Sequence, residues 1–599
     1  MSTDVKGLAN LMSGSGEEKE LIDKLTYMFT SWQSARAGWE AECDEVDLFL
    51  DATDTRTTTN NKLPFKNSTT INKLSQLHMN MTTAYMEHLI PNRDWVDFVG
   101  ADVNSISAEK REAVRAYVRG KAEASNLEGV LERLTDDFVS KGITIAHTRH
   151  IKKMSTTVEN MLINNYTGTV TERIDPRDFY YDVTAKTLRS AAKCIRQLHT
   201  VGGLLKEIRE STNPVMTEEQ FQQLMADRKT IRESIGDGYT GRQKWNRLSK
   251  QGFGDMMAYI NEGIIEVLTF YGDFYNEDTG ELWLDHEITL IDRKMIGRKQ
   301  PLSTWNNSQN LHISVWEFRK GCLAPMSPLA RVVGLQYKLD KRENFREDMH
   351  DKFLEPSLKK VGDVREVGVR GAPGHTFEVE EGGDAVWMTP PVEALQPDQQ
   401  LFVTMNLMEE LSGAPKEAIG QRTPGEKTKF EVQLLDQGQS KTFRRKVKKF
   451  ERELLSPVLQ DYLEQGRHHL DGSDMVKSYG SELGTTEFLN VTADDLNGNG
   501  TMVARGATLF AEKANTLQNV NAILSSPAGQ IVGPHLSRKK FMRMLEDVAD
   551  LSKYDLFTFG VGVQEDQEVA RLAQAAQGNT QEQSLTLGQE KPGEPQQTV

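Results

Sequence analysis

The chain has 599 residues, of which 27% are charged and 38% hydrophobic, and its formal net charge is −15 at pH 7. No run approaches the roughly 18 apolar residues that a membrane helix needs, and we expect no secretory signal, because the start lacks basic and apolar regions. The acidic excess argues against a protein that wraps nucleic acid over its whole surface. Cys43, Cys194 and Cys322 have no CxxC spacing, so we expect inert thiols in a reducing compartment.

The first part of the chain is predicted to be mainly helical, because apolar residues recur at three- and four-residue steps. One amphipathic helix is expected from Glu17 to about Asp51, and its apolar spacing has one long step around Ala35 and Arg36. Ser68 or Thr69 supplies an N-cap for the next helix, which Pro91 ends. Further helices are expected at 108–124 and 127–140.

Mixed elements are predicted in the following 180 residues. Residues 191–240 are predicted to be helical, with a break at Asn213 and Pro214. Two apolar runs, 264–271 and 281–291, flank a turn cluster and indicate a hairpin. Other strands are expected from their β-branched or aromatic content at 144–151, 158–170, 175–183 and 316–320.

A long helix is then predicted at 327–354, where Pro356 ends it. The segment 361–391 is rich in glycine and has short alternating runs, which predicts a small β-unit. A second helix follows, and Gly413 with Pro415 ends it. Its apolar face is expected to consist of Leu401, Met405, Met408 and Leu411.

A polar segment containing Gly420, Pro424 and Gly425 separates this helix from a long amphipathic one. Pro457 is predicted to kink the long helix, because it lacks an N–H group and clashes with the preceding turn. Helices are also expected at 502–524 and 537–551, and the tail from about residue 564 is expected to be disordered. The apolar stripe of the long helix consists of Phe443, Val447, Phe450, Leu454, Val458 and Tyr462.

Three patterns approach ligand-binding motifs without completing them. Residues 420–428 nearly form a P-loop, but Glu426 stands where the phosphate-binding lysine should follow Gly425. Residues 495–500 match half of an EF-hand loop, but Gly506 replaces the bidentate carboxylate, so a plain turn is favoured. Four histidines lack metal-ligand spacing and are interpreted as surface or capping residues: His147, His150, His468 and His469. We therefore expect no enzymatic activity, cofactor or metal.

The strongest charge signal is a basic run on the long helix, consisting of Arg444, Arg445, Lys446, Lys448 and Lys449. A solvated helix face explains this run as readily as contact with phosphates or with an acidic neighbour does. Residues 537–540 with Arg543 form a second, weaker basic cluster.

Three short segments are informative because of the order in which they occur along the chain. Residues 89–98 (LIPNRDWVDF) lead from a proline into a Trp/Phe run, 175–182 read DPRDFYYD, and 326–329 read MSPL. A long helix, a Gly-rich β-unit, a second helix, a Gly/Pro loop and a kinked long helix then follow. This series, over roughly residues 20–550, resembles the portal (head-to-tail connector) proteins of podovirus-type bacteriophages. Met326 departs from their pattern, since a small residue is more usual there.

The resemblance implies an α+β, predominantly helical portal fold with wing, stem, clip and crown regions and a long kinked spine helix. The implied divisions are 1–320 for the wing, 321–360 for the first stem helix, 361–395 for the clip and 396–415 for the second stem helix. They continue with 416–428 for the tunnel loop, 429–500 for the long helix and following loop, 501–563 for the crown and 564–599 for the tail.

The resemblance further implies a ring, usually of about twelve copies, at one vertex of the virion capsid, assembled in the host cytoplasm. Double-stranded DNA would pass through it non-specifically, and the partners would be the terminase large subunit, the major capsid and scaffolding proteins and a tail adaptor. The alternative is a non-enzymatic structural protein of a virion, such as a scaffold or a tail adaptor.

Three groups of site residues are expected on this basis. The tunnel loop would face DNA with Lys416, Gln421, Arg422, Lys427 and Lys429. The basic run on the long helix would contact DNA or neighbouring subunits. The clip would contact terminase or adaptor through Arg365, Arg370, His375 and Glu380.

Overall fold

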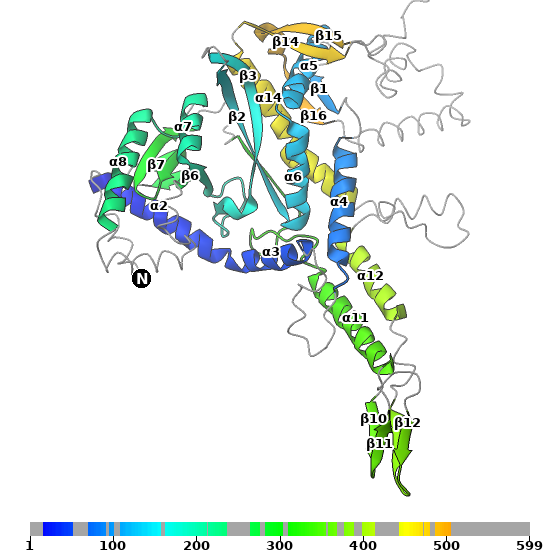
Figure 1. Ribbon diagram of the computed structural model, residues 1–599. Helices are drawn as coiled ribbons and strands as arrows, with labels where there is room; N and C mark the ends of the chain where they lie inside the picture. Colours follow the sequence, from blue (N-terminus) through cyan, green and yellow to red (C-terminus); the bar gives the residue numbers. More distant parts are fainter. Residues whose placement is uncertain are drawn as a thin grey trace, which may run out of the picture. The chain divides into compact units, whose positions relative to one another are not determined.

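The computed structural model describes residues 16–51, 70–90, 95–100, 108–156, 162–211, 214–235, 264–275, 282–302, 310–354, 357–367, 376–388, 398–413, 443–470, 472–479 and 486–504. The chain divides into two compact units, and almost all of these residues belong to the first, Met1–Lys477 with Phe488–Ala507. Helices and antiparallel strands both occur in this unit (Figure 1). The α+β class is therefore confirmed.

The first two helices are α2 (Gly16–Ala35) and α3 (Ala37–Leu50), which meet at Arg36. The single helix predicted from Glu17 to about Asp51 is instead divided into two at Arg36, and the contacts of this side chain explain the division. The guanidinium lies 4.2 Å from the ring centre of Tyr180, and it donates hydrogen bonds to the main-chain oxygens of Phe179 and Arg177. This residue thus ties the helix junction to the strands behind it.

A three-stranded antiparallel sheet has the order β3-β2-β9. Its strands are β2 (Ile143–Thr156), β3 (Leu162–Ile174) and β9 (Leu311–Val315). The strand predicted at 144–151 is confirmed with wider bounds. The strand predicted at 158–170 is confirmed from residue 162 and extends to residue 174, while residues 158–161 lie outside the described residues. The strand predicted at 316–320 is wrong, because β9 ends where Val315 pairs with Ile143, the first residue of β2. Beyond that point the Trp316 amide donates to the main-chain oxygen of Gly142, which precedes β2, and the Trp316 oxygen accepts from Lys446 of the long helix.

A five-stranded antiparallel sheet has the order β4-β5-β6-β7-β8. The predicted hairpin is confirmed as β6 (Ile264–Tyr275) and β7 (Leu282–Ile291), which pair with each other. The turn and strand predicted at 175–183 are confirmed as η2 (Pro176–Asp178) and β4 (Phe179–Tyr181). The remaining strand is β8 (Met295–Pro301).

The helix predicted from residue 191 is wrong at its start, since β5 (Lys193–Thr200) occupies that position. This strand pairs with β4 on one edge and with β6 on the other, so its sheet partners override the local pattern. Helices follow as α7 (Val201–Glu210) and α8 (Glu218–Ile235), on either side of the predicted break at Pro214.

The largest apolar cluster surrounds the long helix, which the structure describes from residue 443. It packs with α4 (Lys73–Leu89), α5 (Ala108–Ala124) and α6 (Leu127–Ser140). All six residues of the predicted stripe are at most 2% exposed, so the stripe is confirmed as a core-facing surface. Phe450, for example, packs edge-on against Phe138 with ring centres 5.1 Å apart.

The irregularity expected at Pro457 lies just before it. A π-helical segment, η6 (Glu451–Leu455), leads directly into α14 (Ser456–His469). Proline cannot donate to the preceding turn, and a widened turn is one of the established ways in which a helix accommodates this loss.

The last described elements are β14 (Ser473–Tyr479), β15 (Thr486–Thr492), α15 (Ala493–Leu496) and β16 (Gly500–Ala504). β16 pairs with β1 (Val96–Gly100), and Met502 lies opposite Phe98. The helix predicted from Met502 is therefore wrong at its start, because the apolar residues there complete a two-stranded ladder. Residues 505–599, including the expected helix at 537–551 and the tail, lie outside the described residues.

Between the two sheets and the long helix in sequence lies a helix–strand–helix segment. It runs from α11 (Val333–Leu354) through four short strands to α12 (Asp398–Ser412). The helix expected from Ser327 begins only at Val333, and the Ser327 hydroxyl instead accepts a hydrogen bond from the Ala330 amide in a turn. The strands are β10 (Ser357–Val361), β11 (Val364–Val367), β12 (Thr376–Val379) and β13 (Asp384–Met388).

Candidate functional site

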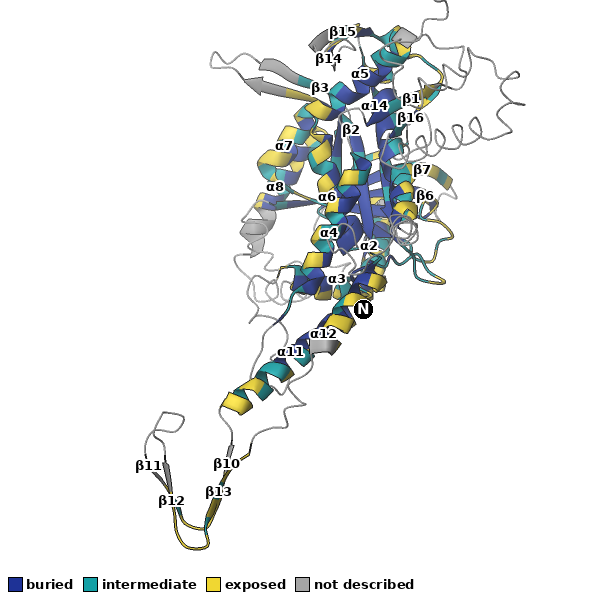
Figure 2. Ribbon diagram, turned by 90° about the vertical axis from the view of Figure 1, so that its right-hand side faces the viewer, coloured by how far each residue is buried: buried dark blue, intermediate teal, exposed yellow. Residues whose placement is uncertain are grey.

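Exposed apolar side chains concentrate on the segment from α11 to α12, which we call the apolar arm (residues 333–413). In the described part of the chain, 12 of the 21 exposed large apolar side chains lie on it. Figure 2 shows exposed residues along both helices and on the strands. Scattered exposed apolar residues are ordinary, but a set gathered on one segment indicates a surface for a partner. The set is Phe345, Phe353, Leu354, Val361, Val379, Val386, Trp387, Met388, Phe402, Val403, Leu407 and Leu411.

The two helices of the apolar arm pack against each other. Arg342 of α11 donates hydrogen bonds to the Thr404 hydroxyl at 2.7 Å and to the main-chain oxygen of Gln400 at 2.9 Å. In the apolar face predicted for α12, Leu401 and Met408 are buried, whereas Leu411 is 54% exposed. The predicted face is therefore buried at Leu401 and Met408 and exposed at Leu411, and other apolar residues extend around α12.

The strands of the arm form two antiparallel pairs, β10 with β13 and β11 with β12. Arg365, a predicted contact residue, lies opposite Glu378 in the β11–β12 ladder and is exposed. Glu380 is also exposed, and its amide donates a hydrogen bond to the main-chain oxygen of Asp363 at 3.3 Å. The other two predicted contact residues, Arg370 and His375, lie outside the described residues.

The basic run on the long helix divides into two kinds of side chain. The Lys446 ammonium donates to the main-chain oxygen of Trp316 at 2.5 Å, lies 4.0 Å from the centre of that indole ring, and is 3.5 Å from Glu317. Lys449 donates to the main-chain oxygen of Val315. These two lysines therefore fasten the helix to the end of β9, and burial lowers the pKa of both ammonium groups.

The other three members of the run, Arg444, Arg445 and Lys448, are exposed. They are the part of the run that a phosphate or an acidic surface can reach. The five residues of the expected tunnel loop, Lys416, Gln421, Arg422, Lys427 and Lys429, lie outside the described residues, as does the P-loop-like stretch at 420–428.

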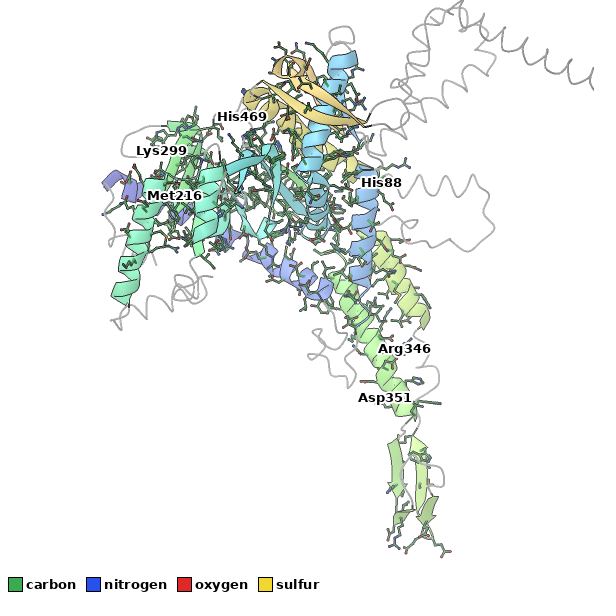
Figure 3. All side chains as sticks on the ribbon, turned by 45° about the horizontal axis from the view of Figure 1, so that its top comes forward. His88, Met216, Lys299, Arg346, Asp351 and His469 are labelled. Atoms are coloured by element: carbon green, nitrogen blue, oxygen red, sulfur yellow. The ribbon has the colours of Figure 1, made fainter. Side chains whose placement is uncertain are left out.

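A polar cavity of about 550 Å³ lies where β2, β5, β6, α7 and α14 approach one another. Four histidines line it, two of which, His147 and His150, are half-buried and so differ from the surface or capping positions predicted for them. The His150 ring stacks on that of His469, at the end of α14 (Figure 3), with centres 4.2 Å apart. Burial, with contributions from His469 and Lys121, lowers the pKa of His150 to about 4.

The cavity wall is held by charged groups that already have partners. Arg149 donates to Glu207 and, at 2.6 Å, to Glu172. Asp461 of α14 is buried and accepts hydrogen bonds from the Thr148 hydroxyl and the His312 imidazole, the latter at 2.6 Å. The wall thus joins β2, β9 and α14. Among the described residues, no group of three or more His, Cys, Asp or Glu side chains is placed to hold a metal ion.

The turn interpretation of residues 495–500 is supported by the use of Asp495. Its carboxylate accepts hydrogen bonds from the amide and hydroxyl of Thr492, at 3.0 and 2.7 Å, in a capping box. These bonds keep the pKa of the carboxyl below its usual value. The carboxylate therefore caps α15 instead of facing a cation.

A group of buried polar residues that the sequence reasoning missed joins the apolar arm to α4. Lys73 and Glu409 form an ion pair at 2.8 Å, and both side chains are less than 10% exposed. Gln336 and Asp340 lie one turn apart on α11 and contact the start of α4. The sequence signal for this contact is the pair Gln336 and Asp340, which are polar residues at an i,i+4 spacing beside the apolar Leu335 and Leu339.

No protein-family model matches the chain, and no curated protein matches it at a significant level. Within the part of the chain that the structure covers, no helix has the length and apolar character required to cross a membrane.

Proposed function

We propose that this chain is the subunit of a bacteriophage portal, a ring at one capsid vertex through which DNA is packaged and later released to the tail. The observation that carries the proposal is the apolar arm. Two packed helices joined by four short strands bear most of the exposed large apolar side chains of the described residues. The arm also precedes a long irregular helix in the order that the portal series of stem, clip, stem, loop and spine helix requires.

In this proposal α11 and α12 are the stem, and the strands between them are the clip that meets terminase and later the tail adaptor. The segment 416–428 is the tunnel loop, and the long helix is the spine. The wing comprises the first 320 residues and the crown residues 501–563. A chain with a net charge of −15 gives a strongly acidic ring, which favours sliding of DNA over adhesion.

The basic run has a divided role in this proposal. Lys446 and Lys449 hold the helix to β9, while Arg444, Arg445 and Lys448 offer weak, non-specific contacts to phosphates or to a neighbouring subunit. No catalytic step is assigned to the chain, since DNA translocation is driven by the ATPase of a separate terminase.

The test is negative-stain imaging of the purified full chain, combined with a mass measurement of the particle. A closed ring of about twelve copies with a central hole is expected. An open filament or a rod would overturn the proposal in favour of a scaffold, and a small adaptor-like oligomer without a channel would also count against it.

A matched pair of variants connects the ring to the apolar arm. Phe402 on α12 is 66% exposed and Tyr27 on α2 is 73% exposed, so neither substitution removes a core residue. Phe402→Asp is expected to prevent ring closure, because it places a charge in the proposed interface, while Tyr27→Asp leaves the ring intact. Rings of equal abundance in both variants would show that the arm is not the interface.

A further inference from the structure

The contact between α4 and α11 is built from hydrogen bonds at the start of α4. The Gln336 side chain accepts from the Leu74 amide at 3.2 Å and donates to the main-chain oxygen of Ile71 at 2.6 Å. The first amides of a helix have no partner inside it, so a side chain from α11 supplies one. Gln336 is fully buried, and water does not replace these bonds while the contact holds.

Asp340 occupies the next turn of α11 and is 1% exposed. One carboxyl oxygen, Oδ1, accepts from Gln336 at 2.9 Å and from the Ile71 amide at 3.3 Å. The other, Oδ2, is buried without a hydrogen-bond partner. An ionised carboxylate with an unpartnered buried oxygen is costly, whereas a neutral carboxyl tolerates this position far better.

The charged groups around Asp340 have partners of their own. On α4, Lys73 pairs with Glu409 of α12 at 2.8 Å. On α11, Arg346, labelled in Figure 3, pairs with Glu343, and Arg342 donates to α12. Burial raises the pKa of Asp340 to about 7, and the groups that oppose this rise are all neutral donors: Gln336, the Ile71 amide and the Thr70 hydroxyl.

We propose that the contact between α4 and α11 is a proton-controlled joint, which holds when the Asp340 carboxyl carries a proton and loosens when that carboxyl ionises. The joint lies at the root of the apolar arm, since the distal side chains Phe353 and Leu354 of α11 are exposed. Its opening therefore changes how firmly the arm is held to α4, without requiring any change inside the two sheets.

The expected pH dependence follows from the two protonation states. The carboxyl has a pKa of about 7 in the closed joint and its ordinary value of 3.8 in the open one, so opening releases a proton. Closure is strongest below pH 3.8 and weakens as the pH rises to about 7, after which it changes no further. Between pH 6 and pH 8 the equilibrium constant for opening is expected to rise about tenfold.

The test is hydrogen–deuterium exchange of the full-length protein at pH 6 and pH 8, corrected for the intrinsic effect of pH on exchange. Protection of residues 73–76 and 333–343 is expected to fall about tenfold at the higher pH, while residues 143–151 of β2 are unchanged. This comparison needs no variant, and equal protection at both pH values would overturn the proposal.

Two substitutions assign the effect to the carboxyl. Asp340→Asn imitates the protonated side chain and is expected to give the same protection at both pH values. Asp384→Asn removes an exposed carboxylate on β13 and is expected to retain the tenfold change. A pH effect that persists in Asp340→Asn would also overturn the proposal, and neither result depends on whether the protein forms a ring.

Discussion

The fastening of the long helix by Lys446 gives a prediction with a calculable magnitude. In Lys446→Met the side chain keeps an apolar stem but loses its ammonium group. The variant gives up a charged hydrogen bond to the Trp316 oxygen, worth about 1.5–3 kcal/mol, and a cation–π contact worth about 0.5–2 kcal/mol. Part of this loss is offset, because methionine packs well and avoids the burial of a charge. We expect a net loss of about 1–4 kcal/mol in the free energy of unfolding.

Arg445→Met is the matched control, since Arg445 belongs to the same basic run but is exposed. Its free energy of unfolding is expected to change by less than about 0.5 kcal/mol. Urea unfolding followed by tryptophan fluorescence measures both variants, and the midpoint is expected to fall for Lys446→Met with an unchanged slope. Equal midpoints for the two variants would refute the division of the run into inward-facing and outward-facing charges.

Three further predictions concern the core, the cavity and a turn. Phe450→Ala is expected to lose about 3–5 kcal/mol in urea unfolding, and Phe450→Leu much less, because the side chain is fully buried. The pKa of His150 is lowered to about 4 from its ordinary value of 6.5. The contribution of the neutral imidazole to the free energy of unfolding is therefore expected to be complete above pH 6.5 and to be lost as the pH drops from 6.5 towards 4. His150→Gln should weaken this dependence of the urea midpoint on pH, and an unaltered profile would contradict the assignment. Gly142→Ala is expected to lower the melting temperature, with a loss of about 2 kcal/mol or more, because φ is +75° and a Cβ would lie 2.6 Å from the main chain of Met326.

The parts of the fold that could be predicted from sequence are those whose structure depends only on residues within one segment. The stripe from Phe443 to Tyr462 faces the core because six apolar residues at helical spacing leave a helix no other surface to bury. The β6–β7 hairpin could be predicted for the same reason, since a turn cluster between two apolar runs is a local signal.

The errors arise where a distant strand decides the local structure. Residues 193–200 have no strong period of their own, and they become a strand because β4 and β6 offer hydrogen bonds on both edges. Met502 starts no helix, because Phe98, some 400 residues earlier, lies opposite it in a ladder. The division of the basic run was equally hidden, since only the position of Trp316 shows which lysines turn inward.

If the chain assembles as proposed, the apolar arm and the proposed joint constrain the kind of assembly that forms. Phe402, Leu407 and Leu411 are exposed on one helix, and exposed apolar side chains that gather on one segment favour association. A contact between unlike faces of identical chains either closes into a ring or continues as a filament. A buried polar contact selects among docked geometries, because Gln336 loses its partners unless α11 is seated correctly on α4, and Glu409 of α12 loses its pair with Lys73 unless α12 is. If all copies hold the arm at one angle, the rotation between neighbours is fixed, which is the physical condition for a ring that closes at a single size.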